Sequence, residues 1–221
     1  MFQKEVVEKI LAQAERMDPG YEMFGASVHK YRLNPPVDQA FVREMEEKYH
    51  FLLPEDYVQF ITEVGDGGAG PDYGITPFGD FLRKAESPGA EKFKEAYRCS
   101  LGKAFRLRPM QPDEVESQYS FSRKAYERAP ENYFAEVEEP DEYTLCNTEG
   151  YFILGTHGCQ WDFGLVTAGE RRGQIFDTDN EGGYCLAADS FHEFYQNWLD
   201  YISDTERFCE KLEEWRRIRN R

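Results

Sequence analysis

Hydrophobic residues recur with helical spacing in three segments near the start of the chain. Over residues 3–16 they fall on one side and a turn at 18–20 ends the pattern: Val6, Val7, Ile10, Leu11 and Ala14. A second helix is predicted after Pro35 and Pro36 from Asp38, Phe41, Val42, Met45 and Tyr49, and a third over 54–64 from Tyr57, Phe60, Ile61 and Val64. One-sided helices must cover another apolar layer, so we expect all three to pack on a sheet.

The third helix runs into a glycine-dense segment, residues 65–74, which predicts a tight turn and then an apolar strand. Gly65 stands where a left-handed C-cap is favoured, and further glycines oppose more helix: Gly67, Gly68, Gly70 and Gly74. A phosphate-binding loop is the alternative interpretation. The segment lacks the Gly-Lys-Ser/Thr ending of such loops and follows a helix instead of preceding one, and Asp66 and Asp72 would repel phosphate. We therefore interpret it as a structural turn.

The last third of the chain has the pattern of a sheet followed by a helix. Residues 151–155, 161–167 and 172–178 are short aromatic or β-branched runs between glycine-bearing turns, which predicts an antiparallel meander. From Ser190, which can form a capping box with Glu193, the apolar positions keep the helical period to Ile202 and on to Trp215. Residues 79–149 mix charged stretches with prolines and predict no single element.

Two blocks of the sequence carry a recognisable motif. The first block is Leu53-Pro54-Glu55-Asp56-Tyr57, then Phe60, then residues 65–74. The second is Gly155-Thr156-His157-Gly158-Cys159, followed by Leu165-Val166, Gly169-Glu170 and residues 173–176. Together they resemble the SUKH superfamily, which includes yeast Smi/Knr-type cell-wall regulators and many bacterial immunity proteins. The resemblance spans about residues 37–202, and the interval 79–149 matches poorly.

This resemblance implies an α+β fold: a single SUKH-like domain with a curved, mainly antiparallel sheet, N-terminal helices packed on it and a long C-terminal helix. Residues 1–221 would form one domain with a common core at about 37–202, a variable insertion at 79–149 and a helical extension at 203–221. The motif positions would then have structural roles: Leu53, Pro54, Tyr57, Phe60, Gly65, Gly67, Gly68, Gly70, Pro71, Gly74, Gly155, Gly158 and Cys159.

The net charge of the chain limits the kinds of partner that it can bind. The formal charge is −16, from 42 acidic and 26 basic residues. Residues 207–221 carry six basic and three acidic side chains, so the first 206 residues hold 20 basic and 39 acidic ones, a net of −19. Direct binding to nucleic acid or to an anionic membrane is disfavoured because both are polyanions, whereas a basic protein fits. Solubility alone is the plainer explanation of an acidic surface.

Candidate chemistry is sparse. The five cysteines form no CxxC pair. No segment has the ~20 apolar residues of a membrane span, and the N-terminus has no apolar core of a secretory signal. We therefore expect a cytoplasmic protein. His157 and Cys159 could pair as base and thiol nucleophile. Gly155, Gly158 and the family resemblance instead favour a strand end or hairpin, in which His157 is a turn residue and Cys159 a small buried hydrophobe. The cysteine and histidine spacing does not fit zinc, and the acidic turn at 177–183 lacks the spacing of a calcium loop. We expect no enzyme, metal or cofactor.

The resemblance and the charge together predict an immunity protein that binds and neutralises a cognate toxin, a nuclease or a nucleic-acid deaminase, through an acidic surface. A regulatory module of the Smi/Knr type with another cellular partner is the alternative, and a thiol enzyme is the third. A homo-oligomer through the C-terminal helix is a further possibility. The candidate contact residues are the acidic ones on the predicted turns and in the densest acidic run: Asp66, Asp72, Glu136, Glu138, Glu139, Asp141, Glu142, Asp177, Asp179 and Glu181.

Overall fold

The computed structural model describes residues 2–79, 101–115, 120–137 and 149–219. Its N-terminal part is helical: α1 (Lys4–Met17), α2 (Ala26–His29), α3 (Gln39–Tyr49) and α4 (Glu55–Gln59), which continues as the π-helical turn η1 (Phe60–Val64). Asp38 caps α3, since its side chain accepts a hydrogen bond from Ala40 N. The three predicted helices are confirmed, and α2 is an addition. Of the predicted α1 stripe, Val6 is exposed.

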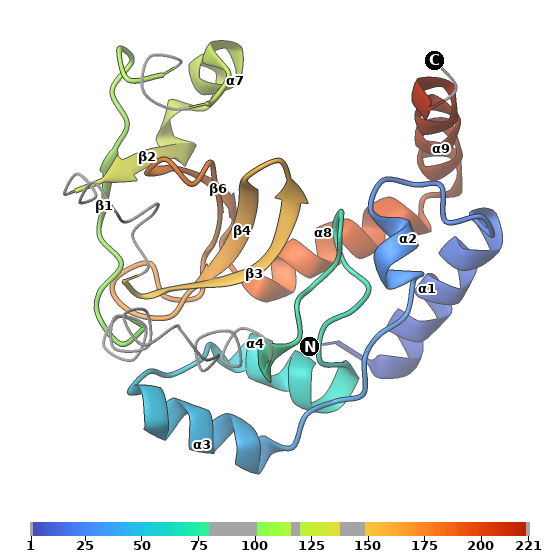
Figure 1. The fold of residues 1–221 in the computed structure, drawn as a ribbon, viewed down its shortest axis with the longest axis horizontal. Coiled ribbons are helices and arrows are strands. Elements are labelled where there is room, and N and C mark those ends of the chain that lie inside the picture. Colours follow the sequence, from blue (N-terminus) through green and yellow to red (C-terminus); the bar gives the residue numbers. More distant parts are fainter. Residues whose placement is uncertain (1, 80–100, 116–119, 138–148, 220–221) are drawn as a thin grey trace, which may run out of the picture.

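One antiparallel sheet of six strands forms the other half of the molecule. The strands are β1 (Leu107–Pro109), β2 (Tyr133–Glu136), β3 (Tyr151–Gly158), β4 (Trp161–Val166), β5 (Ile175–Thr178) and β6 (Gly183–Ala188). Their order is β1-β2-β6-β5-β4-β3, and the sheet curves strongly (Figure 1). The helix α7 (Arg123–Arg128) and the 3-10 turn η2 (Pro130–Asn132) precede β2. The predicted meander is therefore β3, β4 and β5, extended by three strands that the sequence pattern did not reveal.

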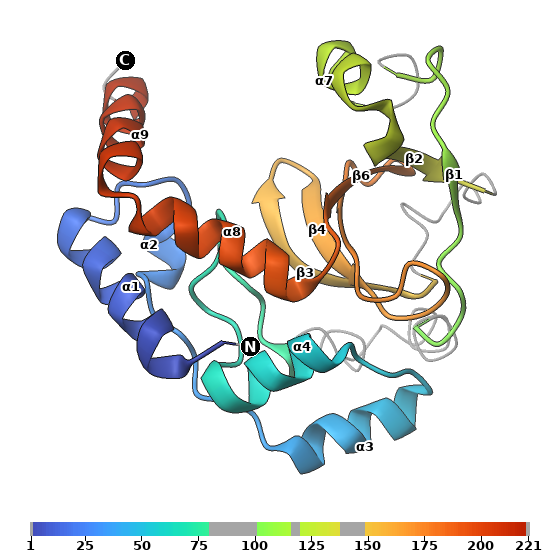
Figure 2. The same ribbon diagram turned by 180° about the vertical axis from the view of Figure 1, so that it is seen from behind.

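Two C-terminal helices complete the fold, where the sequence predicted one. α8 (Phe191–Ser203) is capped by Ser190, whose Oγ accepts from Glu193 N at 3.0 Å. At Asp204 the backbone becomes extended, and α9 (Thr205–Arg219) leaves in a new direction (Figure 2). Asp204 Oδ1 accepts from Arg207 N at 3.1 Å, so the same residue breaks one helix and caps the next. The predicted C-terminal helix is present as α8, and the helical period that runs on to Trp215 belongs to the separate helix α9.

The core joins the helices to the sheet through aromatic rings. In α4 and η1, Tyr57 and Phe60 pack against Phe191 and Tyr195 of α8, with ring centroids 4.6–5.0 Å apart for three of these pairs. Tyr57 also lies 6.2 Å from Phe152 of β3. α8 runs between the sheet and α1 in both views (Figures 1 and 2). The predicted α+β architecture is confirmed.

The glycine segment differs from its prediction at both ends. Gly65 has φ of 179°, an extended conformation and not a left-handed cap. What favours glycine there is space, because a Cβ would lie 2.8 Å from Leu33 Cβ. The strand predicted after the turn is absent from the described residues, since Ile75 forms only an isolated bridge with Gly68. Instead, the segment folds back as a loop that projects along β3 (Figure 1).

Candidate partner-binding surface

His157 draws two acidic segments together at the end of β3. Its Nδ1 hydrogen-bonds to the carboxylate of Asp72, in the glycine segment, and its Nε2 lies 3.0 Å from Asp177 Oδ1 on β5. The three side chains remain 28%, 34% and 30% exposed, respectively. Two of the predicted contact residues, far apart in the sequence, therefore share one imidazole at the surface.

The two carboxylates keep His157 charged. Burial alone lowers the pKa of the imidazole, but the hydrogen bonds and charges of Asp177 and Asp72 outweigh it and raise the pKa to about 10. At neutral pH both ring nitrogens are therefore protonated and donate to a carboxylate. Neither nitrogen is left to take a proton from a thiol, which argues against the third functional hypothesis.

Two expectations about this segment are corrected. His157 is part of β3 and not a turn residue. Cys159 is exposed, with φ of +52°, and is not a buried hydrophobe. The turn between β3 and β4 begins later than the sequence suggested, since Gly158 still pairs with Trp161. This places Cys159 at the tip of the hairpin.

The acidic turn after β5 is built around a buried carboxylate. Asp179 is only 4% exposed and accepts backbone hydrogen bonds from Ser120, Glu181 and Gly183 at 2.9–3.1 Å. It orders the turn and is withdrawn from solvent. Glu181 is exposed at its tip.

Two further candidates also serve the fold. Glu136 is 5% exposed on β2 and accepts from Tyr184 Oη at 2.9 Å. Asp66 is half-buried. Its Oδ1 accepts a hydrogen bond from Phe78 N at 2.8 Å, which stabilises the chain where it leaves the glycine segment. In the described part of the chain, the predicted contact surface is therefore smaller than expected. It consists of Asp72, Asp177 and Glu181. The remaining candidates, Glu138, Glu139, Asp141 and Glu142, lie outside the described residues.

The motif glycines of the two sequence blocks meet at β3. Thr76 N donates to Leu154 O at 2.7 Å, which holds the glycine segment against the strand. A Cβ on Gly155 would lie 2.5 Å from the carbonyl oxygen of Gly74. The close approach of two backbones therefore requires glycine there, and it positions Asp72 for His157.

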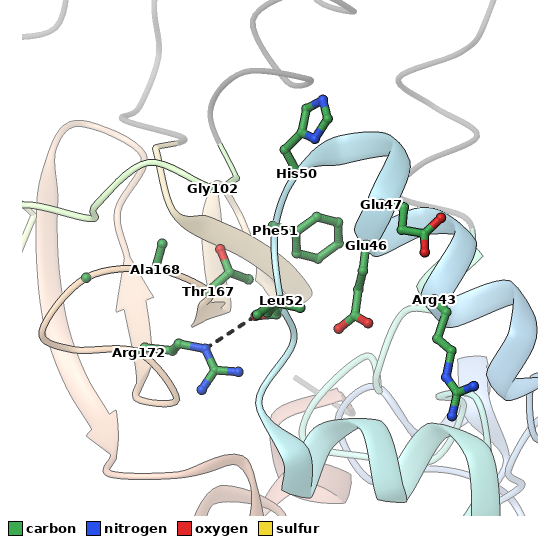
Figure 3. A pocket seen from close by; sticks show the side chains of 11 residues that line it. Arg43, Glu46, Glu47, His50, Phe51, Leu52, Gly102, Thr167, Ala168 and Arg172 are labelled. Carbon is green, nitrogen blue, oxygen red and sulfur yellow. Dashed lines mark hydrogen bonds between the residues drawn. The ribbon is translucent and has the colours of Figure 1, made fainter.

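A separate cleft lies between the end of α3 and the loop after β4 (Figure 3). Its volume is about 590 Å³. Arg172 donates to Leu52 O and, at 2.7 Å, to Leu53 O, and Glu46 Oε1 accepts from Leu53 N at 2.8 Å. These side chains hold the backbone of Leu52 and Leu53, just before α4, against the loop after β4. Their polar groups are therefore already used to stabilise the fold.

Neither a cluster of metal-ligating side chains nor a membrane-spanning helix is found in the described part of the chain. No three His, Cys, Asp or Glu side chains in it come together in a way that could hold a metal ion. None of its helices combines the length and apolar character needed to cross a bilayer.

The sequence matches the model of a known protein family. The model of the SMI1 / KNR4 family (SUKH-1) matches residues 36–197, which is most of the chain. The matched range contains the glycine segment, His157, Asp177 and Glu181. No curated protein matches the chain.

Proposed function

Because the chain belongs to the SMI1 / KNR4 family (SUKH-1), we propose that it is a cytoplasmic immunity protein that binds and neutralises a cognate toxin. The proposed toxin is a nuclease or a nucleic-acid deaminase. The family resemblance implies a protein-binding scaffold of this kind. The observation that carries the proposal is the net charge of −19 on the first 206 residues.

An acidic scaffold suits such a target for a physical reason. An enzyme that acts on nucleic acid holds a polyanion and needs a basic surface, so an acidic protein is steered onto that surface and covers it. Asp72, Asp177 and Glu181 are exposed enough to take part, although His157 offsets one of their charges. The proposed action is binding and occlusion, with no catalytic step.

The name of the family also supports a second candidate, a regulatory module with a non-toxin partner. The two differ in what accompanies the protein. A toxin gene beside the gene for this chain is expected for an immunity protein, and a stable endogenous partner without toxic activity is expected for a regulator.

The experiment is to co-produce the chain with the toxin domain encoded beside its gene. We expect cells that make both to survive and the two proteins to co-purify. The variant Asp177→Asn with Glu181→Gln should weaken the complex. A matched control, Glu44→Gln with Glu47→Gln, removes the same charge from the exposed face of α3, at the opposite end of the molecule (Figure 1). Absence of such a gene, or survival without binding, would overturn the proposal.

A further inference from the structure

A groove lined by six aromatic side chains lies where the segment around α2 and the helices α8 and α9 meet the glycine segment. Its volume is about 280 Å³, enough for one large side chain. The rings come from the segment around α2, from α8 and from α9: Phe24, Tyr31, Trp198, Tyr201, Phe208 and Trp215. Four of the six are half-buried, so part of each ring faces solvent.

The walls of this groove lie outside the range matched by the family. Residues 23–31 and 198–215 form them, whereas the match covers 36–197. The matched core supplies the floor at Gly70, Pro71 and Asp72. α2 and α9 therefore add a binding feature to a common scaffold, which is where a partner-specific contact is expected.

Internal contacts hold the walls in place. Phe24 stacks on Trp215 with ring centroids 4.9 Å apart and planes at 15°. Arg216 Nε lies 2.6 Å from Glu22 Oε2, and Tyr31 Oη donates to Asp18 at 2.9 Å. A groove that is formed before binding loses less conformational entropy on binding.

The polar groups of the groove favour a cation at the end formed by Asp72. Asp72 lines that end, and its carboxylate hydrogen-bonds His157 in the adjoining acidic cluster. Burial lowers the pKa of His29 to about 4, so this lining residue is uncharged at neutral pH. Lys211 is the lining cation, and its Nζ is 2.7 Å from Glu214.

The chain itself shows that these rings accept cations. The guanidinium of Arg207 lies 5.0 Å from the ring centroid of Tyr201, and Lys211 Nζ lies 5.9 Å from that of Trp215. Aromatic faces attract such groups, and arginine does so with a flat guanidinium and an apolar stem.

We propose that this groove binds an arginine side chain, its stem against the rings and its guanidinium toward Asp72. The inference rests on the proposed function only in taking the source of that arginine to be the basic partner. The arginine would anchor the partner beside the acidic cluster, since Asp72 belongs to both surfaces.

The test uses the three tryptophans as reporters. Trp198 and Trp215 line the groove, whereas Trp161 packs against Phe121 elsewhere. The full-length protein is titrated with Nα-acetyl-arginine amide, and the indole N–H signals are followed by NMR. We expect the signals of Trp198 and Trp215 to move saturably and that of Trp161 to stay. Equal or non-saturating shifts of all three would overturn the proposal, as would equal shifts with the norleucine derivative.

Two substitutions with opposite expected effects sharpen the test. Asp72→Asn should weaken binding about fivefold or more, and Lys211→Met should tighten it about twofold or more, because it removes a competing cation. Glu44→Gln, on α3, is the control for net charge. If Asp72→Asn fails to fold, Lys211→Met decides alone, and unchanged or weaker binding overturns the proposal. Since no toxin is involved, failure here is distinct from failure of the immunity function.

Discussion

At the scale of single residues, the main finding is a histidine held as a cation between two carboxylates. The sequence showed His157 beside a cysteine, and that neighbour suggested a thiol site. It could not show the contacts with Asp72 and Asp177, because these come from a loop and a strand that only the fold brings together. The same limit applied to Glu136 and Asp179, whose burial has no signature in a run of acidic residues. Residue types predicted the charge but not its exposure.

The His157 bridge predicts a dependence of stability on pH. The pKa of His157 is raised from 6.5 to about 10 in the folded state, so its contribution is complete below pH 6.5 and is lost as the pH rises to about 10. His157→Gln should therefore lower the free energy of unfolding by about 2 kcal/mol near pH 6.5 and much less near pH 10. Urea unfolding of both proteins across this range measures the difference. A difference in unfolding free energy that stays constant with pH would contradict the pairing of His157 with Asp72 and Asp177.

Two buried tyrosines form a matched pair for a second prediction. Both are fully buried, but Tyr195 Oη donates to Ala69 O at 2.8 Å, whereas Tyr57 Oη has no hydrogen-bond partner in the described part of the chain. Tyr195→Phe should cost about 1–2 kcal/mol of unfolding free energy because it leaves a buried carbonyl unpaired, and Tyr57→Phe should cost less than about 0.5 kcal/mol. Thermal and urea unfolding test this. Equal losses would show that Tyr57 has a partner.

At the scale of elements, local patterns predicted the helices well and the sheet in part. The one-sided stripes of α1, α3 and α4, and the Ser190 cap of α8, are properties of contiguous sequence. The sequence pattern did not predict β6, because Gly183–Ala188 is poor in β-branched residues. It did not predict β2, because that strand lies in a charged region. The break at Asp204 was hidden because the apolar pattern that ends α8 at Ile202 is continued after the break by Phe208 and Leu212. These features depend on tertiary packing.

The contact between the glycine segment and β3 gives a third prediction. A methyl group on Gly155 would meet Gly74 O at 2.5 Å and crowd the ring of Phe163, so Gly155→Ala should lower the unfolding free energy by about 2 kcal/mol or more. Gly20→Ala is the matched control, because its Cβ would meet only the flexible side chain of Glu22 at 3.3 Å. Comparable stability of the two variants would refute the close approach.

At the scale of the whole molecule, an acidic body carries a basic C-terminal end. The sequence predicted this distribution directly, because net charge is a sum over residues. The structure adds that α9 docks on its own chain through the Phe24–Trp215 stack and the Arg216–Glu22 ion pair. Those contacts use part of the aromatic and basic surface that the sequence offered for a homo-oligomer, which stays an untested prediction. The acidic body is the feature that the proposed function depends on.

The association rate constant with the toxin domain encoded beside the gene tests this account most directly. Stopped-flow mixing would measure it between about 0.02 M and about 0.5 M salt. The account predicts a fall of about tenfold or more over that range, and a shallower dependence for Asp177→Asn with Glu181→Gln than for the α3 control. A rate constant that is independent of salt, or equally affected in both variants, would contradict the claim that an acidic surface steers this protein onto its partner.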